Sequence, residues 1–307
     1  MNLSSVSLRQ LEYLVAVADT GGMTAAAARC HVSQSAVSLA VAELERLLEV
    51  RLVIRGPGRG TALTSAGQQA ASQARRVLAA VSELSTEARG LGQDIAGTLR
   101  IGCYGPIAAL HLPAAIAGFR ARAPEVTVEF VEGTIPQLQQ RLLDGRCELA
   151  FLYQQDLVSG IEVEVLHDQP PGVVLPTGHR LARRRSVALG ELSGEPFILL
   201  DVPPSEQYFR SVFDAVGIGM VVAHRAGSFE LARALVARGL GYSLAVQRPV
   251  VQTSVDGLPF VTRPLRDTVP TTPVVLGYAA GGRITRRAQA FAAYCRELFR
   301  GGSAQLL

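Results

Sequence analysis

The sequence predicts a small N-terminal helical domain with a β-wing, a long linker helix, and a C-terminal α/β domain built from two lobes. Apolar residues recur at helical spacing over residues 8–48, and a narrow apolar stripe continues over residues 70–91. From residue 98 onward, short apolar strands alternate with helical segments, as in α/β domains. We therefore divide the chain at 1–64, 65–92 and 93–301, with lobe I at about 97–166 and 269–300 and lobe II at about 167–268.

The N-terminal segment predicts three helices. The first begins near Leu8 and ends near Gly21, since glycine suits a helix end. Thr24 is placed to cap a short second helix over residues 25–30, where a run of alanines lets another helix approach closely. Ser33 is placed to cap a third helix. The predicted buried stripe of this third helix consists of Val37, Val41, Leu44 and Leu48.

Polar side chains gather at the start of the third helix, on the face away from that stripe. They are Gln34, Ser35 and Ser38. Helix amides and hydroxyls can hold phosphate, and glutamine can pair with adenine in the major groove. Two short apolar strands follow and flank a Gly/Pro turn with Arg55 and Arg59, which suits a wing on phosphate or in the minor groove.

The alternative is an ordinary small helical domain with a solvated polar face. It does not account for the full order of helix, alanine-rich helix, capped helix and basic wing. We therefore predict an all-α winged helix-turn-helix that binds double-stranded DNA.

The composition restricts the chemistry that is available. Every basic residue is arginine, so no Schiff-base, P-loop or catalytic lysine exists, while arginine still serves phosphate and guanine contacts. The net charge of +4 permits nucleic-acid binding. The cysteines lie far apart without a CxxC pair, which favours small buried side chains in a reducing compartment; they are Cys30, Cys103, Cys147 and Cys295.

The first residues mix polar and charged side chains without an unbroken apolar segment, so we expect no signal peptide. No window approaches the roughly 20 apolar residues of a membrane helix. Both observations lead us to expect a cytoplasmic protein.

The linker helix is predicted to begin after Thr64, which can cap it, and to reach about Leu91. Its apolar residues alternate by four and three positions, as in a coiled coil. They are Ala70, Ala74, Val77, Val81, Leu84, Ala88 and Leu91. Packing of the helix on its own chain is the alternative, but a narrow stripe on so long a helix favours pairing with a second copy. We expect a homodimer held by Val77, Val81, Leu84 and Leu91, because a two-fold protein fits a palindromic operator.

The C-terminal segment alternates strands and helices. Strands are predicted at 99–103, 126–131 and 148–153, with helices at 106–122 and 135–143, and this alternation predicts a parallel sheet in lobe I. Lobe II is predicted to hold strands at 196–201 and 240–245 and helices at 205–216 and 229–238. The chain then returns to lobe I through a strand at 272–278 and a helix at 284–299.

Two lobes joined by two crossings form a cleft, and open α/β sheets bind ligands at the carboxyl ends of strands, beside helix N-termini. We select candidate effector-binding residues by their position along the strands and helices. They carry hydroxyl groups and few charges, which suits a small anion or carboxylate as the ligand. The alternative roles are helix caps for Thr134, Ser205 and Ser228 and a core position for Tyr153. The candidates are Cys103, Tyr104, Gly133, Thr134, Tyr153, Pro203, Ser205, Ser228 and Tyr242.

The motifs over residues 8–67 closely resemble those of the LysR-type transcriptional regulators, and the later segments follow in that family's order. They are Leu8-Arg-Gln-Leu-Glu-Tyr-Leu, Thr24-Ala-Ala-Ala-Ala-Arg, Val32-Ser-Gln-Ser-Ala-Val-Ser, Leu52-Val-Ile-Arg and Leu63-Thr-Ser-Ala-Gly. The resemblance implies a C-terminal fold similar to periplasmic binding proteins, with an effector cleft, and DNA contacts at Gln34, Ser35, Ser38 and Arg55. It also implies a tetramer built from dimers, and contact with RNA polymerase if the protein activates.

The chain departs from the family pattern at three positions. Ser35 replaces a frequent proline, Val53 replaces a frequent phenylalanine, and Leu39 stands where many members carry a DNA-contacting arginine. The departure at Leu39 affects which operator is bound and leaves the predicted function unchanged.

Three competing hypotheses are less consistent with the sequence. An enzyme would need an organised nucleophile, P-loop or metal motif, but the histidines are dispersed, so we expect no catalytic residue, cofactor or metal. A solute-binding protein without DNA contacts would not carry the winged segment. A thiol redox sensor would need two reactive cysteines in lobe II, where the sequence has none.

Overall fold

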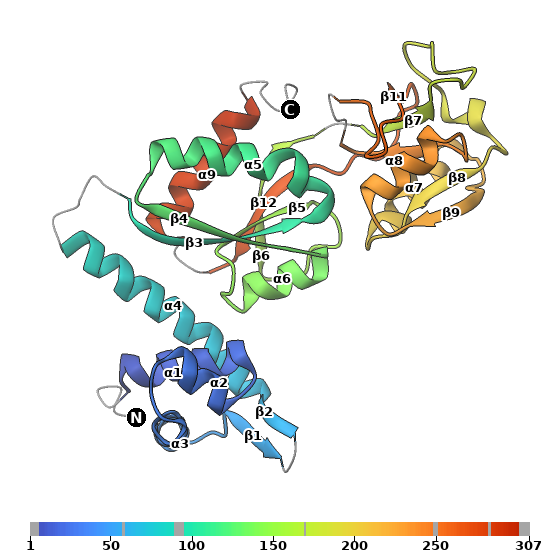
Figure 1. The fold of residues 1–307 in the computed structure, drawn as a ribbon. Helices are drawn as coiled ribbons and strands as arrows, with labels where there is room; N and C mark the ends of the chain where they lie inside the picture. The colour runs from blue at the N-terminus through green and yellow to red at the C-terminus, as the bar shows by residue number, and fades with distance from the viewer. Residues whose placement is uncertain are drawn as a thin grey trace.

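The computed structural model describes residues 6–56, 59–88, 95–168, 170–247, 251–281 and 284–300. An N-terminal domain, one long helix and two α/β lobes follow one another along the chain (Figure 1). Among these residues no helix is both long enough and apolar enough to cross a membrane. The predicted architecture of a winged helix-turn-helix, a long helix and two α/β lobes is confirmed.

Three helices and a two-stranded wing form the N-terminal domain. α1 (Leu8–Thr20), α2 (Met23–Arg29) and α3 (Gln34–Leu48) pack together, and β1 (Val53–Gly56) pairs antiparallel with β2 (Arg59–Leu63). Ser7 caps α1, and Gly21 ends it in the left-handed conformation at φ 72°.

The predicted cap of α3 is confirmed, whereas that of α2 is wrong. The Ser33 hydroxyl accepts the Ala36 N–H at 3.2 Å. α2 begins one residue before Thr24, with Gly22 as its extended N-cap, and Thr24 lies exposed inside the helix. The earlier start places the Met23 side chain on the helix face that packs into the domain core.

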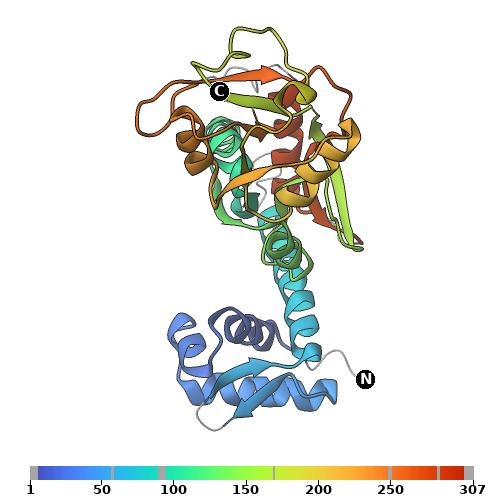
Figure 2. The ribbon, with the colours of Figure 1, turned by 90° about the vertical axis from the view of Figure 1, so that its right-hand side faces the viewer.

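The linker helix α4 (Ser65–Ala88) starts where predicted. The Thr64 hydroxyl accepts the Gly67 N–H at 2.9 Å and donates to the Arg51 carbonyl at 2.7 Å. The first half of α4 packs on α1, with Ala71 and Ala74 buried. Figure 2 shows α4 rising from the N-terminal domain to the C-terminal lobes. Its predicted last apolar position, Leu91, lies outside the described residues.

A cluster of charged groups joins the N-terminal domain, α4 and lobe I. Arg75 of α4 donates from Nη2 to Asp19 Oδ1 of α1 at 2.6 Å and from Nη1 to the Asp144 carbonyl of lobe I at 2.8 Å. Arg29 of α2 also donates to Asp19, at 2.9 Å. Burial alone would raise the pKa of Asp19, but Arg75 and Arg29 outweigh it and hold that pKa below its usual value.

Lobe I is a five-stranded sheet in the order β4-β3-β5-β12-β6. Its helices are α5 (Gly105–Arg122), α6 (Ile135–Leu143) and α9 (Arg286–Arg300), with α5 and α9 on one face and α6 on the other (Figure 1). The strands are β3 (Gly97–Tyr104), β4 (Val126–Gly133), β5 (Leu149–Tyr153), β6 (Ile161–His167) and β12 (Val274–Ala279).

The prediction of a parallel sheet is right for β3, β4 and β5 and wrong for the sheet as a whole. β12 runs antiparallel to both of its neighbours, β5 and β6. The chain leaves lobe I at the carboxyl end of β6 and returns from lobe II on the same side. β12 must therefore run in the opposite direction.

Lobe II contains more strands than the sequence predicts. β7 (Gly172–Pro176) pairs antiparallel with β10 (Ser243–Ala245) and β11 (Phe260–Pro264), and β8 (Phe197–Leu200) runs parallel to β9 (Val222–Ala226). A bridge between Phe197 and Tyr242 connects the two sheets. α7 (Ser205–Val216) and α8 (Phe229–Ala237) follow β8 and β9 and agree closely with the predicted helices.

Candidate nucleic-acid interface and ligand cleft

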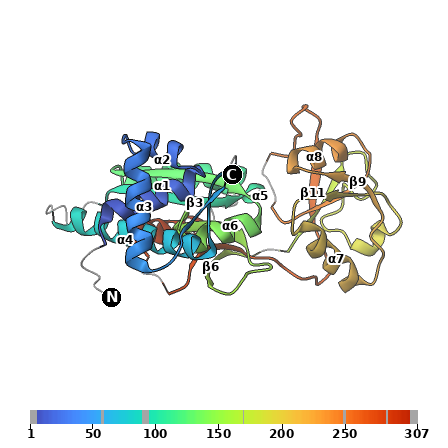
Figure 3. The ribbon, with the colours of Figure 1, turned by 90° about the horizontal axis from the view of Figure 1, so that it is seen from below.

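The outward side of α3 forms what we name the recognition face, made of Gln34, Ser35, Ser38 and Leu39. Gln34, Ser35 and Leu39 are exposed and Ser38 is half-buried. The opposite side of α3 buries the predicted residues Val37, Val41 and Leu44, while Leu48 is half-buried. Figure 3 views the molecule from below and shows α3 in front of α1, with no described element covering it. A duplex can therefore approach this face with the helix inserted in its major groove.

Besides the burial of Leu52 and Val53 against α3, one carboxylate of α3 holds the base of the wing. Glu45 Oε1 accepts the N–H groups of Leu52 and Val53 at 2.7 and 3.0 Å. Charge-assisted hydrogen bonds of this kind are about twice as strong as neutral ones. The backbones of Arg55 and Arg59 lie in β1 and β2, next to the wing turn, and their side chains lie outside the described part of the chain.

A large outer cavity lies between the lobes, with a volume of about 780 Å³. The N-terminal ends of α5, α6 and α8 border it, so backbone N–H groups and helix dipoles point toward its contents. The predicted residues Gly133, Thr134 and Ser228 line it. Ser228 also caps α8, because its hydroxyl accepts the Leu231 N–H at 3.2 Å.

A buried cation, Arg233, also lines this cavity. Arg233 was not among the predicted effector-binding residues. Its guanidinium lies 4.0 Å from the centre of the Phe229 ring and donates to Glu230 at 2.9 Å. Burial lowers the pKa of Arg233, and its Nε and Nη2 atoms have no hydrogen-bond partner among the described residues. Phe229 and Arg233 are four residues apart, which places them on one face of α8, and this spacing was the available signal.

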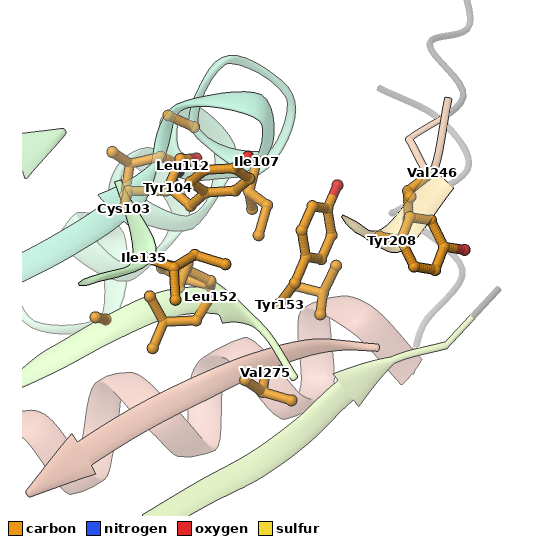
Figure 4. Packing of buried hydrophobic residues seen from close by; sticks show 14 of the residues in the cluster. Cys103, Tyr104, Ile107, Leu112, Ile135, Leu152, Tyr153, Tyr208, Val246 and Val275 are labelled. Atoms are coloured by element: carbon orange, nitrogen blue, oxygen red, sulfur yellow. Dashed lines mark hydrogen bonds between the residues drawn. The ribbon is translucent and has the colours of Figure 1, made fainter. Parts of the chain in front are cut away.

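A small inner cavity of about 20 Å³ lies between the carboxyl ends of the lobe I strands and α7. Figure 4 shows three tyrosines that line it, Tyr104, Tyr153 and Tyr208. Pro106 and Phe229 border both cavities, so the two adjoin. The predicted residues Tyr104, Tyr153 and Ser205 line the inner cavity.

Several hydroxyl groups line the inner cavity beside its apolar residues. Tyr104 donates to the Val202 carbonyl at 3.3 Å, and Tyr208 to the Pro270 carbonyl at 3.0 Å. Burial raises the pKa of both tyrosines, so both remain neutral hydroxyls. Thr272 also borders the inner cavity; it is buried, and its hydroxyl has no hydrogen-bond partner among the described residues.

Three predicted residues are placed away from both cavities. Cys103 immediately precedes Tyr104 on β3, so its side chain points to the other side of the strand and into the lobe I core. Tyr242 packs 5.3 Å from the ring centre of Phe197 inside lobe II. Pro203 does not line the inner cavity, whereas the next residue, Pro204, does.

A second contact between the lobes was also not predicted. His111 Nε2 of α5 lies 2.7 Å from Gln247 Oε1, which follows β10 in lobe II. Both side chains are buried, and burial lowers the pKa of His111. A neutral imidazole therefore holds the lobes together here. Only the tertiary fold brings these residues together, so no local pattern could have shown the pair.

The C-terminal half of α4 presents exposed apolar side chains. Val77 is 44% exposed and Leu84 63% exposed. Both side chains line a groove of about 530 Å³ between α4 and lobe I. Leu142, Tyr278 and Ile284 form part of its other wall.

Two family models match the chain. The model described as "Bacterial regulatory helix-turn-helix protein, lysR family" matches residues 8–68. The model described as "LysR substrate binding domain" matches residues 92–300. The first therefore covers the N-terminal domain and the second covers both lobes.

Known proteins resemble the chain over nearly its whole length. The "Hydrogen peroxide-inducible genes activator" of Dickeya chrysanthemi is 31% identical over 95% of this chain and 95% of its own. HinK, a LysR family transcriptional regulator from Pseudomonas aeruginosa, is 38% identical with a TM-score of 0.64, over 96% of this chain and 99% of its own. A full-length OxyR variant from Pseudomonas aeruginosa is 24% identical with a TM-score of 0.77 over 94% of both chains, a likeness that concerns the fold alone.

Proposed function

Because the chain belongs to the LysR family of transcriptional regulators, we propose that it reads a palindromic operator under the control of a small effector. Residues 1–64 bind double-stranded DNA, residues 65–92 pair two copies, and residues 93–301 bind the effector. The protein acts in the cytoplasm, where its operator is located. It is not an enzyme.

The uncovered recognition face on α3 is the main observation that supports sequence-specific DNA binding. Its polar members lie at the N-terminal end of the helix, where backbone N–H groups also face outward. Ser33 and Thr24 supply further hydroxyls, and Arg55 and Arg59 of the wing supply the cations. These residues are the proposed DNA contacts.

Genome-wide DNA capture with the purified protein tests this assignment. The wild-type protein is expected to enrich palindromic sites, and Gln34→Ala/Ser38→Ala to bind them at least about tenfold more weakly, since one good base contact contributes about 1–3 kcal/mol. The matched control is Gln68→Ala/Ser73→Ala, on the exposed side of α4. If the double variant captures the same sites equally well, the recognition face is misassigned. If nothing is enriched even at low salt, where phosphate contacts are strongest, DNA reading itself is refuted.

The proposed effector is a small molecule with one acidic group and an apolar body. The unpaired donors of Arg233 and the surrounding helix N-termini favour an anion. Glu132 and Glu230 also line the outer cavity, which disfavours a polyanion. Leu110, Val202 and other apolar residues surround the rest of the ligand.

Thermal denaturation with a panel of monocarboxylates tests the effector class. A binding carboxylate is expected to raise the melting temperature saturably, because it binds only the folded protein. Its affinity is expected to fall about tenfold in Arg233→Gln, the loss of one charge-assisted contact. Arg238→Gln, at an exposed arginine beside the same helix, is the control. The class is wrong if no carboxylate changes either stability or operator affinity.

The proposed mechanism links the cleft to the assembly. Effector binding changes contacts that join the lobes, such as Tyr104 with Val202 and His111 with Gln247. The lobes then favour one arrangement of the dimer, or of a tetramer built from two dimers, over another. DNA bending changes with that arrangement, and so does contact with RNA polymerase if the protein activates transcription.

Pairing of two copies is assigned to Val77, Val81, Leu84 and Leu91 along α4 and its continuation. The exposed fractions of Val77 and Leu84 support this assignment. One relative is named a hydrogen peroxide-inducible genes activator, but we do not propose that this chain senses peroxide. Lobe II contains no cysteine in its sequence, and burial raises the pKa of Cys103, Cys147 and Cys295.

A further inference from the structure

Leu39 protrudes from the centre of the recognition face. Its exposed fraction is 74%, and no large apolar side chain among the described residues is more exposed. Ser35 and Ala36 lie one turn before it, and Ala42 and Glu43 lie one turn after it. The first three have short side chains, and Glu43 is paired with Arg46 at 2.6 Å. Leu39 therefore extends beyond its short neighbours toward whatever binds α3.

The rotation of α3 about its own axis is fixed. Val37, Val41 and Leu44 are completely buried on the opposite side. Glu45 holds the C-terminal end of the helix to the wing through two hydrogen bonds. Leu39 therefore cannot turn into the domain core, and it remains on the surface that meets the duplex.

Isolated exposed leucines are common on protein surfaces and need no special explanation. Leu39 differs because it lies among the residues assigned to base reading. A leucine donates and accepts no hydrogen bond, so it cannot read the polar edge of a base. The C5-methyl group of thymine is the apolar feature of the major groove.

We propose that Leu39 selects a thymine in each half-site by packing against its C5-methyl group. This inference rests on the proposed function, sequence-specific DNA binding, and assigns one further base of the operator. Leu39 then favours thymine over cytosine at that position, because cytosine lacks the methyl group. It offers no hydrogen bond to guanine.

Deoxyuridine substitution tests the contact, since it removes the methyl group and leaves base pairing intact. The duplex recovered by genomic capture is prepared with each half-site thymine replaced in turn by deoxyuridine. Full-length protein is titrated against each duplex at one fixed salt concentration. Wild-type protein is expected to lose about fivefold in affinity at one symmetry-related position, and Leu39→Ala to bind both duplexes equally well at that position.

Leu8→Ala is the matched control, since Leu8 is an exposed leucine of the same domain outside the recognition face. It is expected to retain the full fivefold sensitivity. The inference is overturned if wild-type protein binds the operator but responds to no deoxyuridine, or if Leu39→Ala keeps the wild-type response. Both outcomes leave the proposed function in place, whereas failure to capture any DNA removes both.

Discussion

Gly67→Ala is expected to destabilise the N-terminal domain by about 3 kcal/mol, at the upper end of the usual cost of overpacking. A Cβ at position 67 would lie 2.0 Å from the Leu52 carbonyl oxygen and 2.9 Å from its carbon. Both atoms belong to the backbone, and the same carbonyl accepts the Thr64 N–H at 3.0 Å. Neither side can move without separating the start of α4 from the wing.

Urea unfolding followed by circular dichroism measures this effect, together with operator affinity. Affinity is expected to fall with stability, because a displaced α4 changes the direction in which the linker leaves the recognition face. Gly219→Ala adds the same methyl group where nothing lies within 4 Å, and it controls for the loss of glycine itself. Equal stability of the two variants would contradict the close packing described here.

Arg75→Ala is expected to weaken the connection between the N-terminal domain and lobe I. The Arg75 side chain is only 10% exposed and bonds to Asp19 on one side and to the Asp144 carbonyl on the other. Removing it leaves Asp19 paired with Arg29 at 2.9 Å and with Arg146 of lobe I at 3.8 Å. The loss is expected to cost about 2 kcal/mol, since hydrogen bonds to charged groups contribute about 1.5–3 kcal/mol.

Calorimetry distinguishes loss of this connection from general destabilisation. In the wild type the two parts are expected to unfold in overlapping transitions, and in Arg75→Ala the transition of the N-terminal domain is expected to move to lower temperature alone. Arg76→Ala is the control, because Arg76 is the next residue on α4 and forms no ion pair among the described residues. If both variants unfold like the wild type, Arg75 does not join the two parts.

Elements specified by local chemistry could be predicted from the sequence. Ser33 and Thr64 cap their helices because a hydroxyl at a helix start finds a free N–H three residues later. The same chemistry predicted that Thr24 caps α2, and this prediction is wrong. α2 begins at Met23, whose side chain packs into the domain core. The alternating pattern of Ile161–His167 indicated a strand with one exposed face, but the prediction left this segment unassigned.

Features that depend on distant parts of the chain could not be predicted in this way. The reversal of β12 follows from the path through lobe II, and the pair His111–Gln247 joins residues from both lobes. In the cleft, the predicted residues Tyr104 and Tyr153 line the inner cavity. Cys103 lies in the lobe I core instead, because neighbouring residues of a strand face opposite sides of the sheet.

The carboxylate of Glu45 has a consequence for regulation. By accepting the N–H groups of Leu52 and Val53, it ties the base of the wing to α3, so that the two move together as one body. A change in the lobes is then expected to move this body as a whole and to leave its preference for bases unchanged. Besides the bend of the DNA, an effector then changes the helical phase between the two bodies along the duplex, where half-sites repeat about every 10.5 base pairs. The effector-bound and effector-free protein would then prefer operators with identical half-sites but different spacing between them.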